Sequence, residues 1–333
     1  MPCFKPHKVW KNPNTGQVQW HNPYSDIDHN FPIACGQCTG CRTEYARQWA
    51  MRLILEQQQW DNNIFITLTY DDDNLPGNLI EYNDDKWPTS CVWPQPVPGT
   101  LVKKHFQDFM KRLRKKKGAN ENNPIRFFHA GEYGEKYGRP HYHAILFNTN
   151  FSDREVLRGH KGLTTSKTLD KIWGKGHTSI GDVTFQSASY VAGYIQKKIN
   201  GTMETTINPK TGLRHYERFS ELTGEITTLQ KEYSTMSRRP GIAALWLSKY
   251  HSDIYPSDTI HINGMEMQPP KSFERLYEHD QITFPNGSEI LAKVKEKRVE
   301  KGKKFAHLRT PEALAHLEKT HKAKMALYKR KKL

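Results

Sequence analysis

Alternating apolar and polar positions predict several β-strands in the middle of the chain. The clearest lies at 63–70, where isoleucine and leucine alternate with phenylalanine and threonine. Successive side chains of a strand point to opposite faces. We therefore expect the isoleucine and leucine set to pack under a helix, with Thr67 and Thr69 on the other face. Further runs predict strands at 125–130, 142–147 and 176–185.

Apolar residues also recur with helical spacing between and beyond these strands. The segment 101–117 is the clearest case, with Thr100 as its expected N-cap. Its inward-facing positions are Phe106, Phe109, Met110 and Leu113. Other predicted helices lie at 44–60, 166–173, 187–198 and 242–250, and a last one begins at 310. The order strand, helix, strand, strand, helix, strand, helix predicts an α+β sandwich with a central, mainly antiparallel sheet flanked by helices.

Composition divides the chain into three predicted regions. Residues 1–43 form a polar, cysteine-rich arm, 44–252 hold the strands and helices just described, and 253–333 form an accessory region with a basic helical tail. Of the net charge of +15, residues 291–333 contribute +11, from fifteen Lys or Arg and four Glu. This tail suits the phosphates of nucleic acid; a solubilising terminus is the alternative interpretation.

Smaller basic groups are further candidates for phosphate contacts. Lys115 and Lys116 end the helix predicted at 101–117, where they either contact phosphate or complement the helix dipole. Arg238 and Arg239 either hold DNA phosphate or form salt bridges. No apolar run approaches the length of a membrane span, and the N-terminus lacks a signal-peptide pattern. We therefore expect a cytoplasmic protein with no membrane partner.

Three cysteines form a closely spaced cluster, Cys35-x-x-Cys38-x-x-Cys41, with glycine in each gap. This spacing suits thiolates that converge on one metal ion, with Cys3 as a fourth ligand. A structural Zn²⁺ there would hold an otherwise weakly structured arm. The alternatives are reduced cysteines without metal, or redox chemistry. With five cysteines in all, the odd number and the clustering argue against a disulfide framework.

Two histidines stand two residues apart at the start of the strand predicted at 142–147. His141 and His143 share one face of that strand and therefore form part of a metal site. A glycine-rich connection precedes them, so a hairpin would bring Glu132 within reach as an oxygen ligand. The alternative is a pair of histidines on a solvated strand.

Two tyrosines lie on the helix predicted at 187–198. Tyr190 and Tyr194 are four residues apart, which puts both hydroxyls on one helical face. Lys197 and Lys198 lie one turn further on. The alternative is an ordinary amphipathic helix with two half-buried tyrosines.

Together these motifs resemble the HUH endonucleases, the nickases that start rolling-circle replication. The family's His-hydrophobic-His pair is matched by 141–143, and its first motif, an apolar strand ending in threonine, by 65–69. Tyr-x-x-x-Tyr followed by lysine resembles the two-tyrosine branch of small single-stranded DNA phages. The chain as a whole is similar to replication initiators of gokushoviruses (Microviridae), which infect bacteria.

The resemblance implies an RRM-like sandwich and a metal-dependent, site-specific nickase with joining activity, acting on a single-stranded DNA origin. It implies Mg²⁺ or Mn²⁺ at Glu132, His141 and His143. Tyr190 or Tyr194 would attack, aided by Lys197 and Lys198, leaving a 5′-phosphotyrosine and a 3′-OH primer, and rejoining the ends would circularise the genome. Implied partners are origin DNA and the host helicase, polymerase and single-strand binding protein, in the host bacterial cytoplasm. The candidate DNA-binding residues are Arg139, Arg238, Arg239, Lys115 and Lys116.

Three other interpretations stay open on the sequence alone. A relaxase or transposase would use the same site with different partners. A non-catalytic nucleic-acid-binding protein would combine an RRM-like sheet, a zinc knuckle and a basic tail. A zinc-dependent hydrolase would use the His-x-His pair.

Overall fold

The computed structural model describes residues 3–12, 14–22, 30–76, 99–134, 138–160, 162–194, 202–219 and 224–330. These residues fall into two compact units. One is Trp49–Tyr250, and the other combines Met1–Gln48 with His251–Leu333. The three regions with boundaries at 43/44 and 252/253 stay a prediction.

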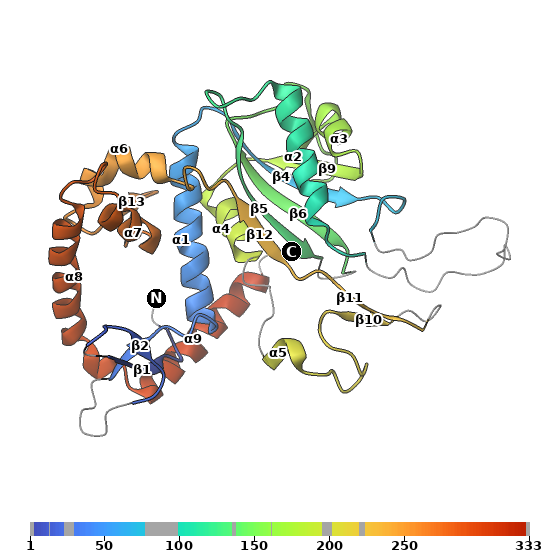
Figure 1. Ribbon diagram of the computed structural model, residues 1–333. Coiled ribbons are helices and arrows are strands. Elements are labelled where there is room, and N and C mark those ends of the chain that lie inside the picture. The colour runs from blue at the N-terminus through green and yellow to red at the C-terminus, as the bar shows by residue number, and fades with distance from the viewer. Residues whose placement is uncertain are drawn as a thin grey trace. The chain divides into compact units, whose positions relative to one another are not determined.

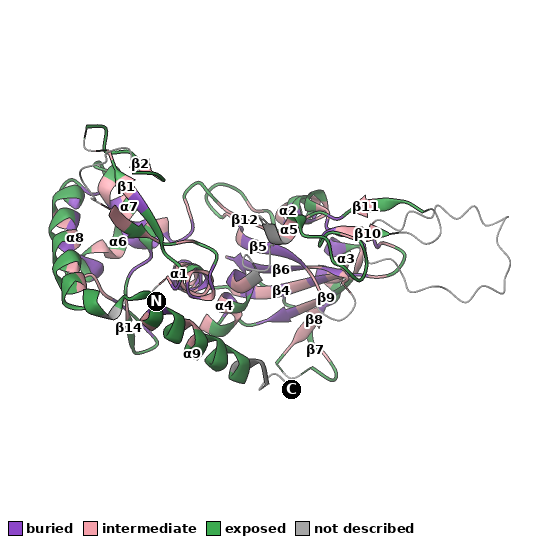
Figure 2. Cartoon of the chain, turned by 90° about the horizontal axis from the view of Figure 1, so that it is seen from below, coloured by how far each residue is buried: buried purple, intermediate pink, exposed green. Residues whose placement is uncertain are grey.

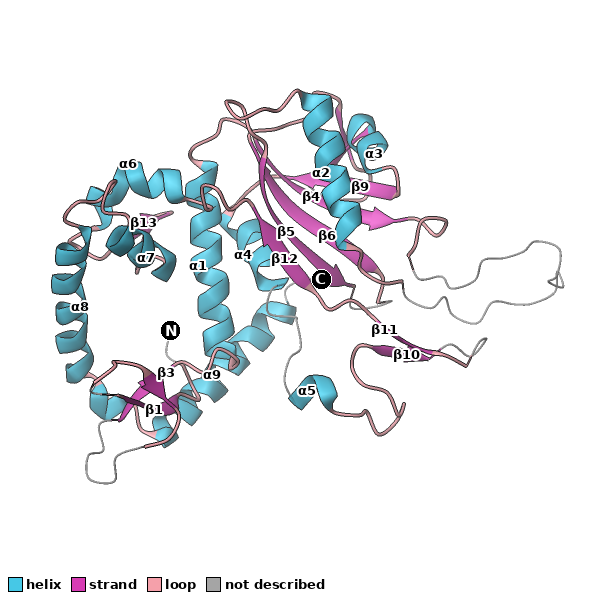
Figure 3. Cartoon of the chain, in the orientation of Figure 1, coloured by secondary structure: helices cyan, strands magenta, loops and turns pink. Residues whose placement is uncertain are grey.

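A seven-stranded antiparallel sheet forms the centre of the first unit, in the order β12-β5-β6-β4-β9-β8-β7 (Figure 3). The predicted α+β class with a large antiparallel sheet is thereby confirmed. The strands are β4 (Asn63–Tyr70), β5 (Arg126–Tyr133), β6 (Pro140–Phe147), β7 (Arg154–Val156), β8 (Thr164–Ser166), β9 (Gly176–Gly181) and β12 (Tyr233–Met236).

Helices α2 (Lys103–Lys117) and α3 (Lys167–Trp173) cover one face of this sheet (Figure 1). Strand β4 follows its predicted alternation, because every second residue from Ile64 to Tyr70 is buried. The four inward positions predicted for α2 are buried in the same core. They are Phe106, Phe109, Met110 and Leu113.

Helix α4 (Phe185–Tyr194) lies against the opposite face, over β5 and β6 (Figure 1). Its buried residues Ala188, Val191 and Ala192 have the i, i+3, i+4 spacing of one helical face. Two of the three are alanines, so the helix axis can approach the sheet closely. Trp49, from the later part of α1 (Thr39–Gln57), also packs on this face, with its ring centroid 4.9 Å from that of Phe128.

A buried ion pair ties the loop before α6 (Ala244–Ile254) to the sheet. The Arg126 Nε donates to Glu56 Oε1 at 2.6 Å, and the side chains are 6% and 0% exposed. The backbone N–H of Ala243 donates to the second Glu56 oxygen at 2.6 Å, while Arg126 also donates to the Pro240 carbonyl. Both charges are therefore hydrogen-bonded, as burial requires.

The predicted cap at Thr100 is wrong. Helix α2 begins at Lys103, after Val102 in an extended conformation without a side-chain cap. The Thr100 hydroxyl instead accepts the N–H of Gln230 at 3.0 Å. The N–H of Val102 donates to the Tyr142 hydroxyl at 2.8 Å, so a contact distant in sequence keeps the chain extended past the expected start.

Other boundaries also shift. Helix α1 spans Thr39–Gln57 instead of 44–60, and α6 begins at Ala244 instead of 242. Helix α4 begins at Phe185, because Thr184 and Ser187 exchange the reciprocal bonds of a capping box. The sequence of 200–235 has no clear periodicity and predicted no elements, but the structure has a short helix and three strands there. They are α5 (Thr202–Thr205), β10 (Glu217–Phe219), β11 (Ile226–Thr228) and β12.

The second unit contains two small sheets and a set of helices. The last helix begins at Pro311, close to the predicted start at 310, and Thr310 caps it, because Thr310 Oγ1 accepts the N–H of Ala313. Most of that helix is exposed (Figure 2). Among the described helices, none has the length and apolarity to cross a membrane. The elements are β1 (His7–Lys11), β2 (Val18–Gln19), β3 (Asn30–Ile33), β13 (Ile260–Ile262), β14 (Met265–Met267), α7 (Lys271–His279), α8 (Gly287–Lys304), η1 (Ala306–Leu308) and α9 (Pro311–Arg330).

The buried ion pair generates a stability prediction. Glu56→Ala should destabilise the protein by about 3–5 kcal/mol, because the Arg126 charge stays buried without its partner. Urea unfolding followed by tryptophan fluorescence measures this loss. The exposed Glu121→Ala is the matched control and should change stability by less than about 0.5 kcal/mol. Equal stability of the two variants would contradict the role given to the pair.

Candidate functional site

Strand register gathers five polar side chains on the sheet face that α4 partly covers. Strands β5 and β6 form the predicted hairpin, with Glu132 opposite His141. On the other side of β6, Thr67 of β4 pairs with His143, and Thr69 pairs with His141. Residues directly opposite in neighbouring strands share a face. The structure thus brings the three predicted metal ligands to one face.

Two threonine hydroxyls hold the histidine rings. Thr67 Oγ1 lies 3.0 Å from Nδ1 of His143, and Thr69 Oγ1 lies 3.1 Å from Nδ1 of His141. In the tautomer that donates each Nδ1–H to its threonine hydroxyl, Nε2 would keep the lone pair that a metal ion requires. A second hydrogen bond of this kind orients ligating histidines in metal sites generally.

Glu132 and His143 are in direct contact. The Glu132 Oε1 lies 2.8 Å from His143 Nε2, and their side chains are 6% and 8% exposed. Adjacent ligands at about 2.1 Å from an octahedral ion lie about 3 Å apart, so this pair fits two neighbouring coordination positions. Within the described residues, these three ligands do not form a converged cluster. A metal ion shared by Glu132, His141 and His143 therefore remains a proposal.

Tyr190 lies beside this pair. Its ring centroid is 5.6 Å from that of His143 in an edge-on arrangement, and its side chain is partly exposed to solvent. Phe65 lies parallel to the His143 ring, with centroids 5.9 Å apart and planes inclined by 5°, and its centroid is 6.5 Å from that of Tyr190. Tyr194 is the last residue of α4, and its side chain lies outside the described structure, as do Lys197 and Lys198.

Buried tyrosines under the sheet are chemically different from Tyr190. The Tyr142 and Tyr70 hydroxyls are 2.7 Å apart, and Tyr70 also contacts Nδ1 of His105 at 2.7 Å. Burial raises the pKa of Tyr142 to about 12 and raises that of Tyr70 further above its usual range. These phenols stay neutral and lie on the face away from His143, so they brace α2 and do not reach the candidate site.

The predicted DNA-binding cations lie in different settings. The Arg139 guanidinium bonds to Asp72 at 2.5 Å and to the Tyr70 carbonyl at 3.1 Å, so it already fixes the end of β4. Arg238 and Arg239 are exposed. Lys115 and Lys116 are exposed too, but α2 carries them on the sheet face opposite the histidines. The structure therefore does not bring these two lysines to the candidate site.

Sequence reasoning missed one histidine on the same sheet face. Strand β9 pairs with β4 so that His177 stands opposite Thr69 and Ser179 opposite Thr67. His177 is exposed. The signal was the alternation within 176–181, which can be interpreted only once β9 is known to pair with β4.

The four predicted cysteines converge in the second unit. Their sulfur atoms all lie within 4.8 Å of one another, including 4.0 Å between Cys35 and Cys41 and 3.9 Å between Cys38 and Cys3. Sulfurs around a tetrahedral Zn²⁺, at about 2.3 Å from the ion, lie about 3.8 Å apart. The cluster can therefore hold a metal ion.

Backbone N–H groups point at these sulfurs. The N–H of Cys35 donates to Cys3 Sγ at 3.2 Å, and that of Cys38 donates to Cys35 Sγ at 3.3 Å. Burial acts to raise the pKa of the Cys38 thiol, but N–H donation from Cys41 and Phe4 outweighs it and lowers that pKa to about 6. At Cys38 these N–H groups thus stabilise the thiolate, the form that binds metal, whereas burial raises the pKa of Cys3 and Cys41.

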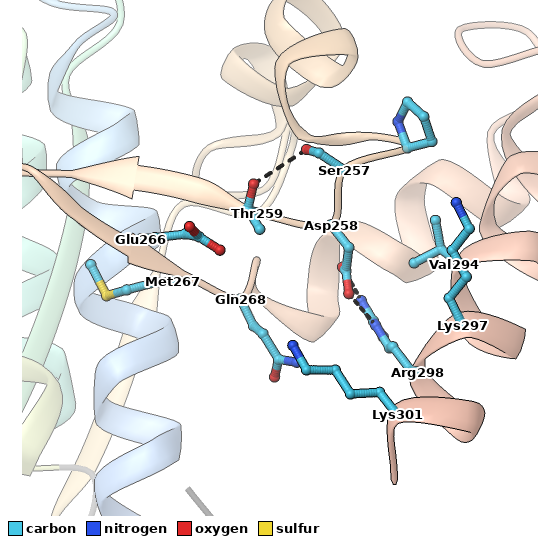
Figure 4. A pocket seen from close by; sticks show the side chains of 11 residues that line it. Ser257, Asp258, Thr259, Glu266, Met267, Gln268, Val294, Lys297, Arg298 and Lys301 are labelled. Atoms are coloured by element: carbon cyan, nitrogen blue, oxygen red, sulfur yellow. Dashed lines mark hydrogen bonds and ion pairs between the residues drawn. The ribbon is translucent and has the colours of Figure 1, made fainter. Parts of the chain in front are cut away.

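A separate pocket of about 270 Å³ in the second unit is lined in part by an ion pair. The Asp258 carboxylate faces the Arg298 guanidinium (Figure 4), and Glu274 also accepts from Arg298 at 2.7 Å. Hydrogen bonding to Asp258 raises the pKa of Arg298. None of the predicted site residues lines this pocket.

Comparisons with known proteins point to one kind of relative. The family model for the replication-associated protein ORF2/G2P matches residues 63–199, which include Glu132, both histidines and both tyrosines of the motifs. The chain resembles phage replication-associated proteins. The expected resemblance to phage replication proteins is thereby confirmed.

Three curated relatives have this description. Replication-associated protein VP4 of Bdellovibrio phage phiMH2K is 27% identical over 308 residues, covering 89% of this chain and 84% of that protein. Replication-associated protein ORF2 of Spiroplasma virus 4 is 29% identical over 298 residues, covering 84% and 81%. Replication-associated protein ORF4 of Chlamydia phage 1 is 28% identical over 176 residues, covering 51% and 39%. No solved structure matches the chain.

The threonine–histidine bonds generate a prediction about metal affinity. Replacing both site threonines, Thr67→Val and Thr69→Val, should weaken Mn²⁺ binding about 10- to 100-fold, because the histidine rings lose their orienting bonds. Titration calorimetry measures the affinity. Thr228→Val, an exposed strand position of the same unit, is the control. Unchanged Mn²⁺ affinity in the double variant would exclude the orienting role.

Proposed function

We propose that this chain is a phage replication initiator that nicks a single-stranded DNA origin through a tyrosine nucleophile. The observation that supports it best is the Tyr190 ring 5.6 Å from His143, which contacts Glu132 on the same sheet face. The match of 63–199 to replication-associated proteins covers this whole arrangement. The proposal also assigns the HUH-endonuclease, RRM-like fold to the sheet and its helices.

The proposed chemistry is a phosphoryl transfer to tyrosine. The phenol oxygen of Tyr190 or Tyr194 attacks the scissile phosphorus, a new O–P bond forms, and the bond to the 3′ oxygen breaks. The leaving 3′ oxygen takes up the proton that the phenol loses, so the products are a 5′-phosphotyrosine and a 3′-OH. Mg²⁺ or Mn²⁺ held by Glu132, His141 and His143 would supply positive charge next to the phosphate oxygens.

The attacking tyrosine needs electrostatic help at neutral pH. An ordinary tyrosine has a pKa of about 10, so its phenolate is scarce. We assign that help to Lys197 and Lys198, whose ammonium groups would stabilise the developing charge. The partial exposure of Tyr190 supports its role, because a DNA phosphate can reach its hydroxyl.

Two tyrosines on one helix suit a reaction of two transfers. After one round of synthesis, the second tyrosine attacks the regenerated origin, and the released 3′-OH attacks the first phosphotyrosine and closes the circle. Each step exchanges one phosphoester for another, so neither ATP nor a ligase is required. The first 3′-OH would prime a host polymerase, with host helicase and single-strand binding protein as further partners in the host bacterial cytoplasm.

Binding of the DNA strand would rest on exposed cations. Arg238 and Arg239 are exposed on a loop that the buried Glu56–Arg126 pair holds in place. The basic residues of 291–333 would add sequence-independent attraction to phosphate. Arg139, Lys115 and Lys116 stay in the proposal as secondary contacts.

The cysteine cluster is proposed to hold a structural Zn²⁺. Four sulfurs at tetrahedral spacing, with backbone N–H groups donating to them, match the ligand set of closed zinc sites. Cys3 comes from the chain start and Cys41 from the first turn of α1, so the ion would join these two segments. No open coordination position remains, which favours a structural role over a catalytic one.

The tyrosine pair can be tested by substitution with phenylalanine. Labelled single-stranded origin DNA is incubated with the protein and Mn²⁺, and adducts that survive SDS and heat are counted. Each single variant, Tyr190→Phe or Tyr194→Phe, should keep some adduct, and the double variant should form none. Phenylalanine keeps the ring, so the loss reports the hydroxyl.

The matched control for this test is Tyr45→Phe, since Tyr45 is similarly exposed on a helix. It should form adduct at the wild-type level. Covalent attachment that persists in the double variant would refute the proposed nucleophiles, and absence of any adduct from the wild type would refute nicking through tyrosine.

The zinc proposal predicts about one zinc per chain in freshly purified, reduced protein. Cys38→Ala should lower the zinc content and the thermal stability, because the closed site loses a ligand. Elemental analysis and thermal unfolding measure both. Cys91→Ala, at the fifth cysteine of the sequence, should leave them unchanged. A wild-type protein without zinc would exclude this assignment.

A further inference from the structure

A polar pocket lies next to the candidate site on the same sheet. It has a volume of about 260 Å³ and is lined by Thr69, His177 and Ser179, together with side chains from three neighbouring elements. Thr69 also holds His141 through its hydroxyl, so the pocket and the histidine pair share this residue. The pocket therefore begins one strand away from the proposed ligands.

The strand arrangement explains why the pocket exists. Strand β8 pairs with β9 through Thr164 and Ile180, and within the described residues that register extends no further toward His177. Thr165 of β8 and Leu157, which follows β7, also line the pocket. Helix α4 covers β5 and β6, so the exposed His177 on β9 is open to a ligand.

The lining favours a nucleobase over a phosphate. The pocket offers an imidazole for stacking, hydroxyls for hydrogen bonds and an apolar wall at Leu157, a combination that recognises unpaired bases. Asp170 also lines it and accepts the Thr178 hydroxyl at 2.7 Å. A carboxylate repels phosphate but accepts hydrogen bonds from the amino groups of bases.

We infer that this pocket binds one unpaired base of the DNA strand, next to the scissile phosphate, with His177 stacking on the base and Asp170 setting the preference among bases. The inference rests on the proposed nicking function, because that function supplies the single strand. Adenine, cytosine and guanine carry amino groups that can donate a hydrogen bond to Asp170, whereas thymine carries no amino group. The pocket thus selects the origin at one position beside the nick.

An abasic scan tests this inference. Short fluorescent single strands tiled along the genome that encodes the chain are screened for the tightest binder. That strand is then remade with one abasic site at each position in turn. Wild-type protein should lose about 10-fold in affinity at one position, the loss expected for one base contact. His177→Ala and Ser179→Ala should bind the intact strand more weakly and show little further loss at that position.

The matched control is His261→Ala, an exposed histidine in the middle of β13 in the other unit. It should reproduce the wild-type scan. If His177→Ala and Ser179→Ala also reproduce it, or if no position is sensitive in the wild type, the pocket inference is overturned. The abasic scan measures equilibrium binding, whereas the SDS test measures covalent attachment. Failure of the proposed nicking would therefore show separately, as a wild-type protein that forms no adduct.

Discussion

The pairing of β6 with β5 on one side and β4 on the other is the constraint on which the candidate site depends. It sets Glu132 against His143 at 2.8 Å and gives each histidine a threonine partner at its other ring nitrogen. A one-residue slip of this register would turn the histidines into the core under α2 and would expose Tyr142. The apolar half of the same strands prevents that slip, because Ile64, Tyr142 and Leu146 are fully buried.

Burial of the apolar side chains on one face of the sheet thus fixes the polar site residues on the other face. On the α2 face, the hydroxyls of Tyr70 and Tyr142 bond to each other and connect α2 to the sheet. On the opposite face, α4 packs on β5 and β6 through small residues, and its Tyr190 lies beside His143. Strands β4 and β9 keep polar side chains on the uncovered part of this face. A DNA strand along it would meet the tyrosine, the histidine pair and the pocket of His177 in turn. Such a path would connect the proposed nicking site with the proposed base pocket.

The sequence predicted the parts of this arrangement that follow from local pattern. The alternation of 63–70 matches β4 residue for residue, and the glycine-rich turn before His141 correctly indicated a hairpin that brings Glu132 near. Contacts between residues far apart in the chain could not be predicted from the sequence. Thr100 failed as a cap because hydroxyls from distant strands hold the chain extended.

The edge strand β12 was also missed, since Tyr-Ser-Thr-Met carries no clear alternation, and His177 gained meaning only through the pairing of β9. The helical spacing of Tyr190 and Tyr194 was readable from sequence, but the approach of Tyr190 to His143 depends on how α4 packs. The cysteines were readable as a cluster with Cys3 as its fourth member, and the structure brings the four sulfur atoms together.

Peptide mapping of the covalent protein–DNA adduct tests the central claim most directly. The adduct formed with origin DNA and Mn²⁺ is digested with protease and nuclease, and the modified peptide is sequenced by mass spectrometry. The account predicts a nucleotide joined through a 5′ phosphate to the tyrosine oxygen of residue 190 or 194. A nucleotide attached to any other residue, or cleaved DNA without any attached peptide, would contradict it.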